Sequence, residues 1–340
     1  MSRPKAYVLL AGALFLVGLV AYQAYRGRPQ PQPLPAPTAG LAWLPGEAGL
    51  VAGINIAEIR NQPWLLELIR RVSGEVQEGP DYRAFVEATG FDYTRDLDQL
   101  WVGVFGPSGQ PLVVGVVEGR FAREKILAEV ARQGGLLSRH QGVSMYEVQT
   151  GSPPGRRRPT EPPRRFAFAF LDEAHLAFAS ELRGVAAVVD CWQGRAPAVG
   201  SDALRRAGIE RVAAGRQLWL VDELGRWQPR AFLEQQSLQN LLTQAALGVR
   251  VSEEGLELEA EARCRESQQA QRLRDNLRIA LLAGRLALGR QTDRTSQALA
   301  ETISTLDLTQ QGDLVRARVL LGRETLAALL GTSAATLTRP

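Results

Sequence analysis

A strict alternation of apolar and acidic residues over positions 256–262 is the feature that most constrains the fold. Leucine or alanine occupies every second position, and Glu257, Glu259 and Glu261 lie between them. Successive side chains of a strand point to opposite faces of a sheet, so this segment predicts a strand with one apolar face and one carboxylate face. Such a strand favours an antiparallel sheet that is covered on its apolar side.

The same local order, two strands joined by a turn and followed by a helix, recurs four times. It predicts an α+β fold in which antiparallel sheets are built from repeated strand–hairpin–helix units, with helices packed on one face. The expected strand pairs are 99–105 with 111–117, 166–171 with 176–180, 247–252 with 256–262, and 305–309 with 314–320. The helices expected after them begin at 122, 184, 267 and 324. Further elements are expected as strands at 49–55, 143–148 and 217–221 and helices at 64–72, 80–89 and 202–214, with Ser201 as the cap of the last.

An uncharged apolar run at residues 6–22 precedes this body. Arg3 and Lys5 come before the run and Arg26 and Arg28 after it. As a helix it would reach roughly 26 Å, close to the hydrocarbon thickness of a bilayer. We therefore expect a single transmembrane anchor at 6–25 behind a cytoplasmic tail at 1–5. A cleaved secretory signal is the alternative, but the sequence lacks a clean small-residue cleavage site.

A proline-rich segment, 26–40, follows the anchor. Prolines at every second position favour a semi-rigid polyproline stalk; a ligand for a small proline-binding domain is the alternative. Beyond the stalk we expect two α+β halves, 41–200 and 201–340, outside the bacterial inner membrane on the periplasmic side. The protein is thus predicted to be single-pass, with membrane contact through residues 6–25.

The net charge of +4 belongs to the N-terminal segment. Residues 1–40 carry four basic residues and no acidic one, which leaves 36 basic and 36 acidic residues in the body. A neutral body argues against specific nucleic-acid binding.

Residue sets that carry catalysis are missing from the sequence. The chain has two histidines, His140 and His175, and two lysines, with no metal-binding spacing and no nucleophile motif. We expect no catalytic, cofactor-binding or metal-ligating residues, and hence no enzymatic activity.

Two acidic patterns have structural and ligand-binding interpretations. Asp92, Asp96 and Asp98 lie around Arg95, in a predicted turn or an incomplete calcium site. The glutamate row of 256–262 is expected to lie opposite Arg316 and Arg318 if the two strand pairs share a sheet. A cation site on that row is the alternative.

Two further residue groups are candidate binding features. An arginine-rich loop can contact anions, or is simply a solvated extension; its arginines are Arg156, Arg157, Arg158, Arg164 and Arg165. An aromatic strand face is expected to be buried under a helix, or to form a groove for an apolar ligand; it consists of Phe166, Phe168, Phe170 and Phe178.

Cys191 and Cys264 lie in different halves of the body. An oxidising compartment permits a bridge between them, whereas two buried thiols are equally compatible with the sequence.

Several strings resemble a group of uncharacterised bacterial membrane-anchored proteins that share a domain of unknown function. The strings are residues 44–52 (LPGEAGLVA), 90–98 (GFDYTRDLD), 119–121 (GRF) and 168–172 (FAFLD). The resemblance implies an N-terminal anchor and an exported α+β body, and it implies no catalytic residues.

The resulting hypothesis is a non-enzymatic, membrane-anchored envelope protein whose body binds another envelope component. An extracytoplasmic carrier or sensor of an apolar small ligand is the second hypothesis. A hydrolase with an unrecognised site is the third.

Overall fold

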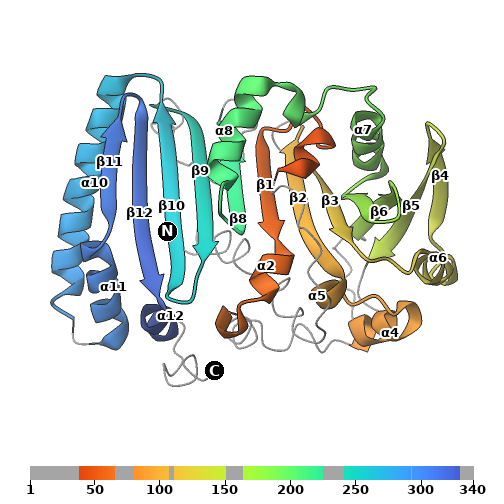
Figure 1. The fold of residues 1–340 in the computed structure, drawn as a ribbon, viewed down its shortest axis with the longest axis horizontal. Coiled ribbons are helices and arrows are strands. Elements are labelled where there is room, and N and C mark those ends of the chain that lie inside the picture. Colours follow the sequence, from red (N-terminus) through yellow and green to blue (C-terminus); the bar gives the residue numbers. More distant parts are fainter. Residues whose placement is uncertain are drawn as a thin grey trace, which may run out of the picture.

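The computed structural model describes residues 38–65, 80–106, 111–150, 164–224, 241–291 and 293–329. Within these ranges twelve strands form one antiparallel sheet (Figure 1), in the order β11-β12-β10-β9-β8-β1-β2-β3-β7-β6-β5-β4. The α+β class and the antiparallel pairing predicted from the sequence are confirmed. The prediction of several sheets is wrong, because every described strand joins this one.

The strands in chain order are β1 (Leu50–Asn55), β2 (Leu97–Phe105), β3 (Leu112–Gly119), β4 (Leu136–His140), β5 (Val143–Thr150), β6 (Arg164–Phe170), β7 (His175–Ala179), β8 (Leu218–Asp222), β9 (Leu242–Val251), β10 (Gly255–Cys264), β11 (Asp307–Gln311) and β12 (Leu314–Gly322). The α-helices are α2 (Ile56–Arg60), α4 (Pro80–Thr89), α5 (Tyr93–Asp96), α6 (Arg123–Arg132), α7 (Leu182–Trp192), α8 (Ala203–Ala213), α10 (Ser267–Leu288), α11 (Arg294–Ser304) and α12 (Arg323–Leu329). Short 3₁₀ turns lie at Ala39–Ala42 and Val199–Ser201.

The two predicted halves of the body meet at strand β1. This first strand of the body pairs with β2 on one side and with β8 on the other. Gly53 of β1 lies directly opposite Trp101 of β2 and Trp219 of β8. Residues 41–200 and 201–340 therefore contribute to one continuous sheet.

A close glycine–tryptophan contact fixes the sheet at this junction. A Cβ atom on Gly53 would lie 2.4 Å from Cε2 of Trp219, so the indole ring lies directly on the glycine backbone. Trp101 and Trp219 are both fully buried. Glycine is needed at position 53 because any side chain would occupy the space of this ring.

Helices cover both faces of the sheet, which corrects the expectation of helices on one face only. In the first half, Val185 and Val188 of α7 pack in the core cluster that includes Ala169 and Ala177. On the opposite face, α6 packs against Phe168 and Phe170. These strands are apolar on both faces, and the small alanines let α7 approach closely, so each face needs its own cover.

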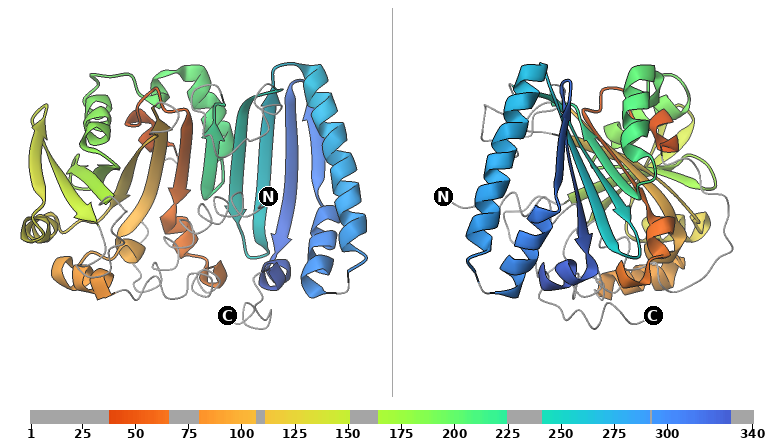
Figure 2. Two further views of the ribbon diagram at one scale, coloured as in Figure 1. Left: turned by 180° about the vertical axis from the view of Figure 1, so that it is seen from behind. Right: turned by 60° about the vertical axis from the view of Figure 1, so that its left-hand side comes forward.

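In the second half the helices also lie on two sides. Figure 2 shows α10 and α11 on one side of the sheet and α8 on the other. Helix α8 packs on the face that carries Trp219 and Ala246, whereas α10 covers the face of Leu308 and Val315. Beyond α8, the first face carries the charged side chains described below.

Local differences from the sequence predictions have simple causes. Helix α11 and strand β4 were not expected, and β4 places His140 at the end of a strand rather than in a connection. Asp202, not Ser201, caps α8, because its carboxylate accepts the backbone N–H groups of Leu204 and Arg205. Most of the helix expected at 64–72 lies outside the described residues.

Candidate functional site

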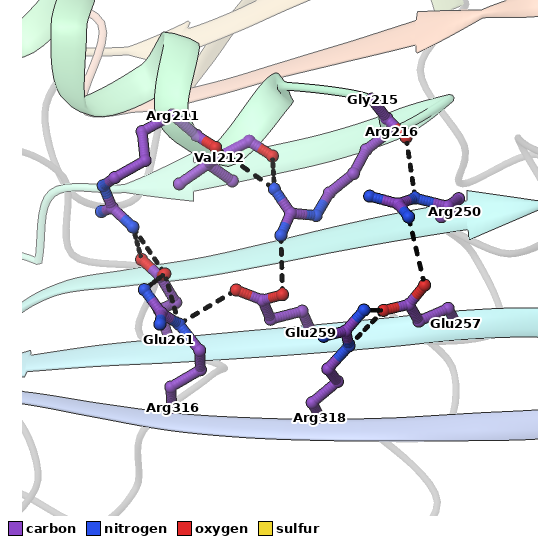
Figure 3. A network of polar contacts seen from close by, with 10 residues as sticks. All are labelled: Arg211, Val212, Gly215, Arg216, Arg250, Glu257, Glu259, Glu261, Arg316 and Arg318. Atoms are coloured by element: carbon purple, nitrogen blue, oxygen red, sulfur yellow. Dashed lines mark hydrogen bonds and ion pairs between the residues drawn. The ribbon is translucent and has the colours of Figure 1, made fainter. Parts of the chain in front are cut away.

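The glutamate row of β10 is the centre of a charged network on one face of the sheet. Strand β10 lies between β9 and β12, and Glu259 and Glu261 lie directly opposite Arg318 and Arg316 of β12. The predicted opposition of the glutamate row and the two arginines is therefore confirmed. We call this network the Arg–Glu lattice; its members are Arg211, Arg216, Arg250, Glu257, Glu259, Glu261, Arg316 and Arg318 (Figure 3).

Arg316 and Arg318 bind the glutamates from β12. Arg316 bridges two carboxylates, with Nε 3.0 Å from Glu259 Oε1 and Nη2 2.9 Å from Glu261 Oε1. Arg318 pairs with Glu257. Arg316 thus joins Glu259 and Glu261, whereas Glu257 belongs to a second group that meets the first at the turn of Gly215 and Arg216 (Figure 3).

Helix α8 and the turn after it supply two further arginines. Arg211 Nη1 lies 2.5 Å and 2.7 Å from the two carboxylate oxygens of Glu261. Arg216 Nη2 lies 2.7 Å from Glu259 Oε2, and its Nη1 donates to the carbonyl of Val212 at 2.6 Å. These contacts link the lattice to the C-terminal end of α8, where cations interact favourably with the helix dipole.

Arg250 of β9 closes the lattice at its other end. Its Nη1 lies 3.6 Å from Glu257 Oε2, and its Nε donates to the carbonyl of Gly215 at 3.2 Å. The β9–β10 register places Arg250 directly opposite Glu257. The sequence prediction missed this pair, because the expected strand ends at 252 and 256 align Arg250 with Leu258; the observed turn is one residue shorter and closes between Ser252 and Gly255.

The carboxylates of the lattice are 7–20% exposed, and four of its five arginines are more exposed than that. The side chain of Glu261 is 7% exposed, whereas those of Arg250 and Arg318 are 47% and 52% exposed. Burial alone would raise the pKa of Glu261, but hydrogen bonds from Arg211 and Arg316 outweigh it and hold this pKa below the ordinary glutamate value. Five arginines against three ionised glutamates leave the lattice with two excess positive charges.

The sheet surface beyond the lattice is accessible. Asp307 and Thr309 of β11 lie opposite Arg318 and Arg316 and are exposed. Leu320, opposite Glu257, is 43% exposed. The lattice thus borders an open surface that carries positive charge and one accessible apolar side chain, an arrangement suited to binding a protein segment.

The alternative of a cation site on the glutamate row does not fit the lattice geometry. All three carboxylates point to arginines, so their oxygens are already occupied by charge-assisted hydrogen bonds. Among the described residues no group of His, Cys, Asp and Glu side chains is arranged to hold a metal ion.

The aromatic face of β6 and β7 belongs to the core. Phe168 and Phe170 are buried against Ile126 and Val130 of α6, as expected for a strand face under a helix. Phe178 packs partly buried beside them, and Phe166 at the strand entry is 37% exposed. The stacked Phe166–Phe178 and Tyr146–Phe168 ring pairs occupy this face.

The arginine-rich loop lies almost wholly outside the described residues. This applies to Arg156, Arg157 and Arg158, and to the side chain of Arg164. Arg165 in β6 is exposed, and its Nη1 lies 3.7 Å from Glu147 Oε1 in β5.

The acidic cluster before β2 is part of an arginine network. Asp96 is buried and pairs with Arg95 at 2.9 Å, while Asp98 lies 3.1 Å from Nη1 of Arg60. Asp96 also accepts the backbone N–H of Asp92 at 2.9 Å. These contacts agree with the turn interpretation of the cluster rather than with a calcium site.

Both histidines pair with an aspartate. His140 Nε2 lies 2.8 Å from Asp190 Oδ1, and His175 Nδ1 lies 2.8 Å from Asp172 Oδ2. The Asp172 contact closes the tight turn between β6 and β7, since the same carboxylate accepts the backbone N–H groups of Ala174 and His175.

Cys191 and Cys264 are both free and buried. Burial raises the pKa of the Cys191 thiol to about 11, with the nearby carboxylate of Asp190 adding to the effect. This agrees with the interpretation of two buried thiols and not with a bridge between the halves.

Among the described residues no helix has the length and apolar character needed to cross a membrane. The expected anchor at 6–25 and the stalk lie outside those residues.

The geometry thus defines an α+β protein with a long antiparallel sheet and a charged surface on one face. No protein-family description and no curated protein sequence matches the chain. Its similar solved structures include three crystal forms of TP0453. Form I is 10% identical with a TM-score of 0.44, and the match covers 86% of this chain and 97% of that chain. Form III is 10% identical with a TM-score of 0.47 over 85% and 96% of the two chains, and form IV is 11% identical with 0.43 over 87% and 100%.

Those values are too low to define a shared fold or function. The resemblance to the bacterial membrane-anchored proteins therefore stays a prediction from the sequence.

Proposed function

We propose that this chain is a membrane-tethered, non-enzymatic binding protein of the bacterial envelope, whose Arg–Glu lattice recognises an acidic segment of another envelope component. The observation that carries the proposal is the charge excess of the lattice. Its carboxylates are at most 20% exposed and bonded to arginines, while Arg250 and Arg318 are half-exposed beside the accessible Leu320. Arginines at an open surface are suited to pairing with carboxylates, because the guanidinium group retains free donors.

The tether rests on the N-terminal sequence. The uncharged run at 6–22 lies between basic flanks, and we place residues 6–25 across the inner membrane with the body on the periplasmic side. The proline-rich segment 26–40 would extend about 3 Å per residue and link the anchor to the body. A tethered partner-binding body needs no catalytic residues.

The apolar-ligand hypothesis is less well supported by the geometry. The phenylalanine face that motivated it is filled by Ile126 and Val130 of α6. The hydrolase hypothesis rests on no more than the two His–Asp pairs, His140 with Asp190 and His175 with Asp172.

Crosslinking in intact cells followed by recovery of the full chain tests the proposal. The double variant Arg250→Gln, Arg318→Gln removes the two most exposed lattice charges. Glu259 and Glu261 keep Arg211, Arg216 and Arg316, whereas Glu257 loses both of its arginine partners, so an unchanged melting temperature must first show that the variant folds. We expect recovery of the wild-type partner to fall about tenfold, since charge-assisted contacts contribute roughly 1–3 kcal/mol each.

The matched control is Arg183→Gln, Arg206→Gln. Both arginines lie on helices of the same body, have side chains 59% and 52% exposed, and pair with Glu181 and Glu210. The control should retain the partner. Equal recovery with both double variants, or no specific partner for the wild-type chain, would contradict the proposal.

A further inference from the structure

Helix α10 is long but poorly buried. Of its 22 residues only Ala270 is fully buried. The helix rests on the sheet through Ala270, Leu273 and Leu281, which pack in one cluster with Leu308 and Val315. Most of its remaining surface is in contact with solvent.

An apolar stripe runs along the outer side of this helix. Ile279, Leu282 and Leu286 are 68%, 61% and 59% exposed. Their spacing of three and four residues places them in one line on a helix. At about 100° per residue this line lies on the side opposite Ala270 and Leu281, so the stripe points away from the sheet.

Arginines border the stripe. The helix carries Arg272, Arg274, Arg278 and Arg285, and its only acidic residue, Asp275, ends the stripe one turn before Ile279, where it pairs with Arg274 at 2.7 Å. The helix therefore has a formal charge of +3. A second copy of α10 docked on the stripe would bring another +3 into contact, which is repulsive, whereas an anionic surface is attractive.

We infer that α10 lies on an anionic phospholipid surface, with Ile279, Leu282 and Leu286 buried among the acyl chains and the arginines at the headgroups. An apolar stripe bordered by arginines is typical of helices that lie in the membrane interface. Five charged side chains favour this orientation over one that crosses the bilayer.

This inference specifies how the tethered body is oriented relative to the membrane. Helix α10 covers one face of the sheet and the Arg–Glu lattice lies on the other (Figure 2). If α10 rests on the bilayer, the lattice faces away from it, toward components in the surrounding space. The inference goes beyond the proposed function, because a tether alone would leave the body free to rotate.

A fluorescent label on Leu282→Cys in the full chain, reconstituted into nanodiscs, tests the inference. The native thiols are buried, so the new cysteine is labelled selectively. The matched control is Leu204→Cys on α8, a leucine that is 87% exposed. With phosphatidylglycerol discs, nitroxide lipids should quench the label at 282 at least about twofold more than the label at 204. With phosphatidylcholine discs the difference should shrink.

Two variants separate the apolar and electrostatic contributions. Ile279→Gln should lower the ratio of membrane-docked to undocked body about tenfold, because a glutamine at this position gains no free energy from burial among the acyl chains. Arg278→Gln, Arg285→Gln should reduce the preference for phosphatidylglycerol about fivefold per arginine. The three side chains are exposed, and an unchanged melting temperature checks that each variant folds.

Each remaining outcome has a definite meaning. Equal quenching at 282 and 204 in phosphatidylglycerol discs overturns the inference. Shielding of 282 in detergent that grows with protein concentration also overturns it and indicates a second copy on the stripe. If the chain does not co-elute with the discs, the proposed transmembrane tether is wrong. The free chain is then mixed with phosphatidylglycerol vesicles, and the inference about α10 stands only if the label at 282 is again quenched more than the label at 204.

Discussion

Arg216 lies across the backbone of Gly248. A Cβ atom at position 248 would lie 2.0 Å from Cδ of Arg216, and only the bare glycine lets this side chain cross β9 to reach Glu259 at 2.7 Å. One glycine in β9 thus connects the turn after α8 to the carboxylate row of β10. Gly248 is important to the fold because it leaves space for the side chain of Arg216.

Substitution of Gly248 by alanine should break this connection. The arginine can swing away, so the expected cost is the lost ion pair and helix-end hydrogen bonds, about 1–3 kcal/mol of unfolding free energy by urea denaturation. Gly208→Ala in α8, where nothing lies within 4 Å of the added carbon, should instead stabilise by up to about 1 kcal/mol. A neutral Gly248→Ala variant would show that the Arg216 crossing contributes nothing.

Glu261→Gln should destabilise the protein by about 1–3 kcal/mol at about pH 7, because Arg211 and Arg316 lose their shared carboxylate. The folded-state pKa of Glu261 is lowered, so its stabilisation is complete above the ordinary value of 4.5 and is lost as the pH falls through the lowered pKa. The difference between variant and wild type should therefore shrink in acid. Glu210→Gln, a half-exposed control on α8, should change stability by less than about 0.5 kcal/mol at either pH.

Gly53→Ala should be among the most damaging single changes in the body. The added methyl group would lie 2.4 Å from the indole of Trp219, which is fully buried and has no room to move aside. We expect a loss of about 2–3 kcal/mol in thermal or urea unfolding. Gly322→Ala in β12, with no atom near the added carbon, is the control and should be nearly neutral.

Asp222→Asn should stabilise the protein at neutral pH. Burial, with a smaller contribution from the charge of Glu223, raises the pKa of Asp222 to about 6, and its Oδ1 has no hydrogen-bond partner among the described residues. A raised carboxyl pKa means that the folded state binds the proton more tightly, so wild-type stability should fall as the pH rises from about 4 to about 6. The stability of the variant should lack this dependence on pH. Above pH 6 its free energy of unfolding should exceed that of the wild type by about 1–2 kcal/mol, since solvent screens part of the burial cost of the partly exposed carboxylate. Parallel pH profiles for both proteins would refute this account.

The sequence predicts local pairing well because pairing within a hairpin depends on neighbouring residues. Alternation at 256–262 places Glu257, Glu259 and Glu261 on one face, whereas the expected turn at 253–255 is one residue too long and would align Arg250 with Leu258 instead of Glu257. The opposition of the row to Arg316 and Arg318 required only that two hairpins lie side by side.

Contacts between distant segments could not be predicted in this way. Nothing local indicates that Arg211 and Arg216 reach β10, because they come from a helix and a turn about 50 residues earlier. The cover of both faces was missed because a single helix was assigned to each hairpin, although Ala167 and Ala169 are fully buried under α7 on the face opposite the phenylalanines.

The central place of β1 has a consequence for the order of folding. During synthesis β1 emerges with β2 available on one side, but its other neighbour, β8, belongs to the second half of the body. Until β8 has been synthesised, one edge of β1 stays unpaired and can form hydrogen bonds with other strands or other chains. If the chain were cut near Gly200, one fragment would keep an unpaired edge of β1 and the other an unpaired edge of β8. Neither half is therefore complete alone, and the body should unfold in a single cooperative transition.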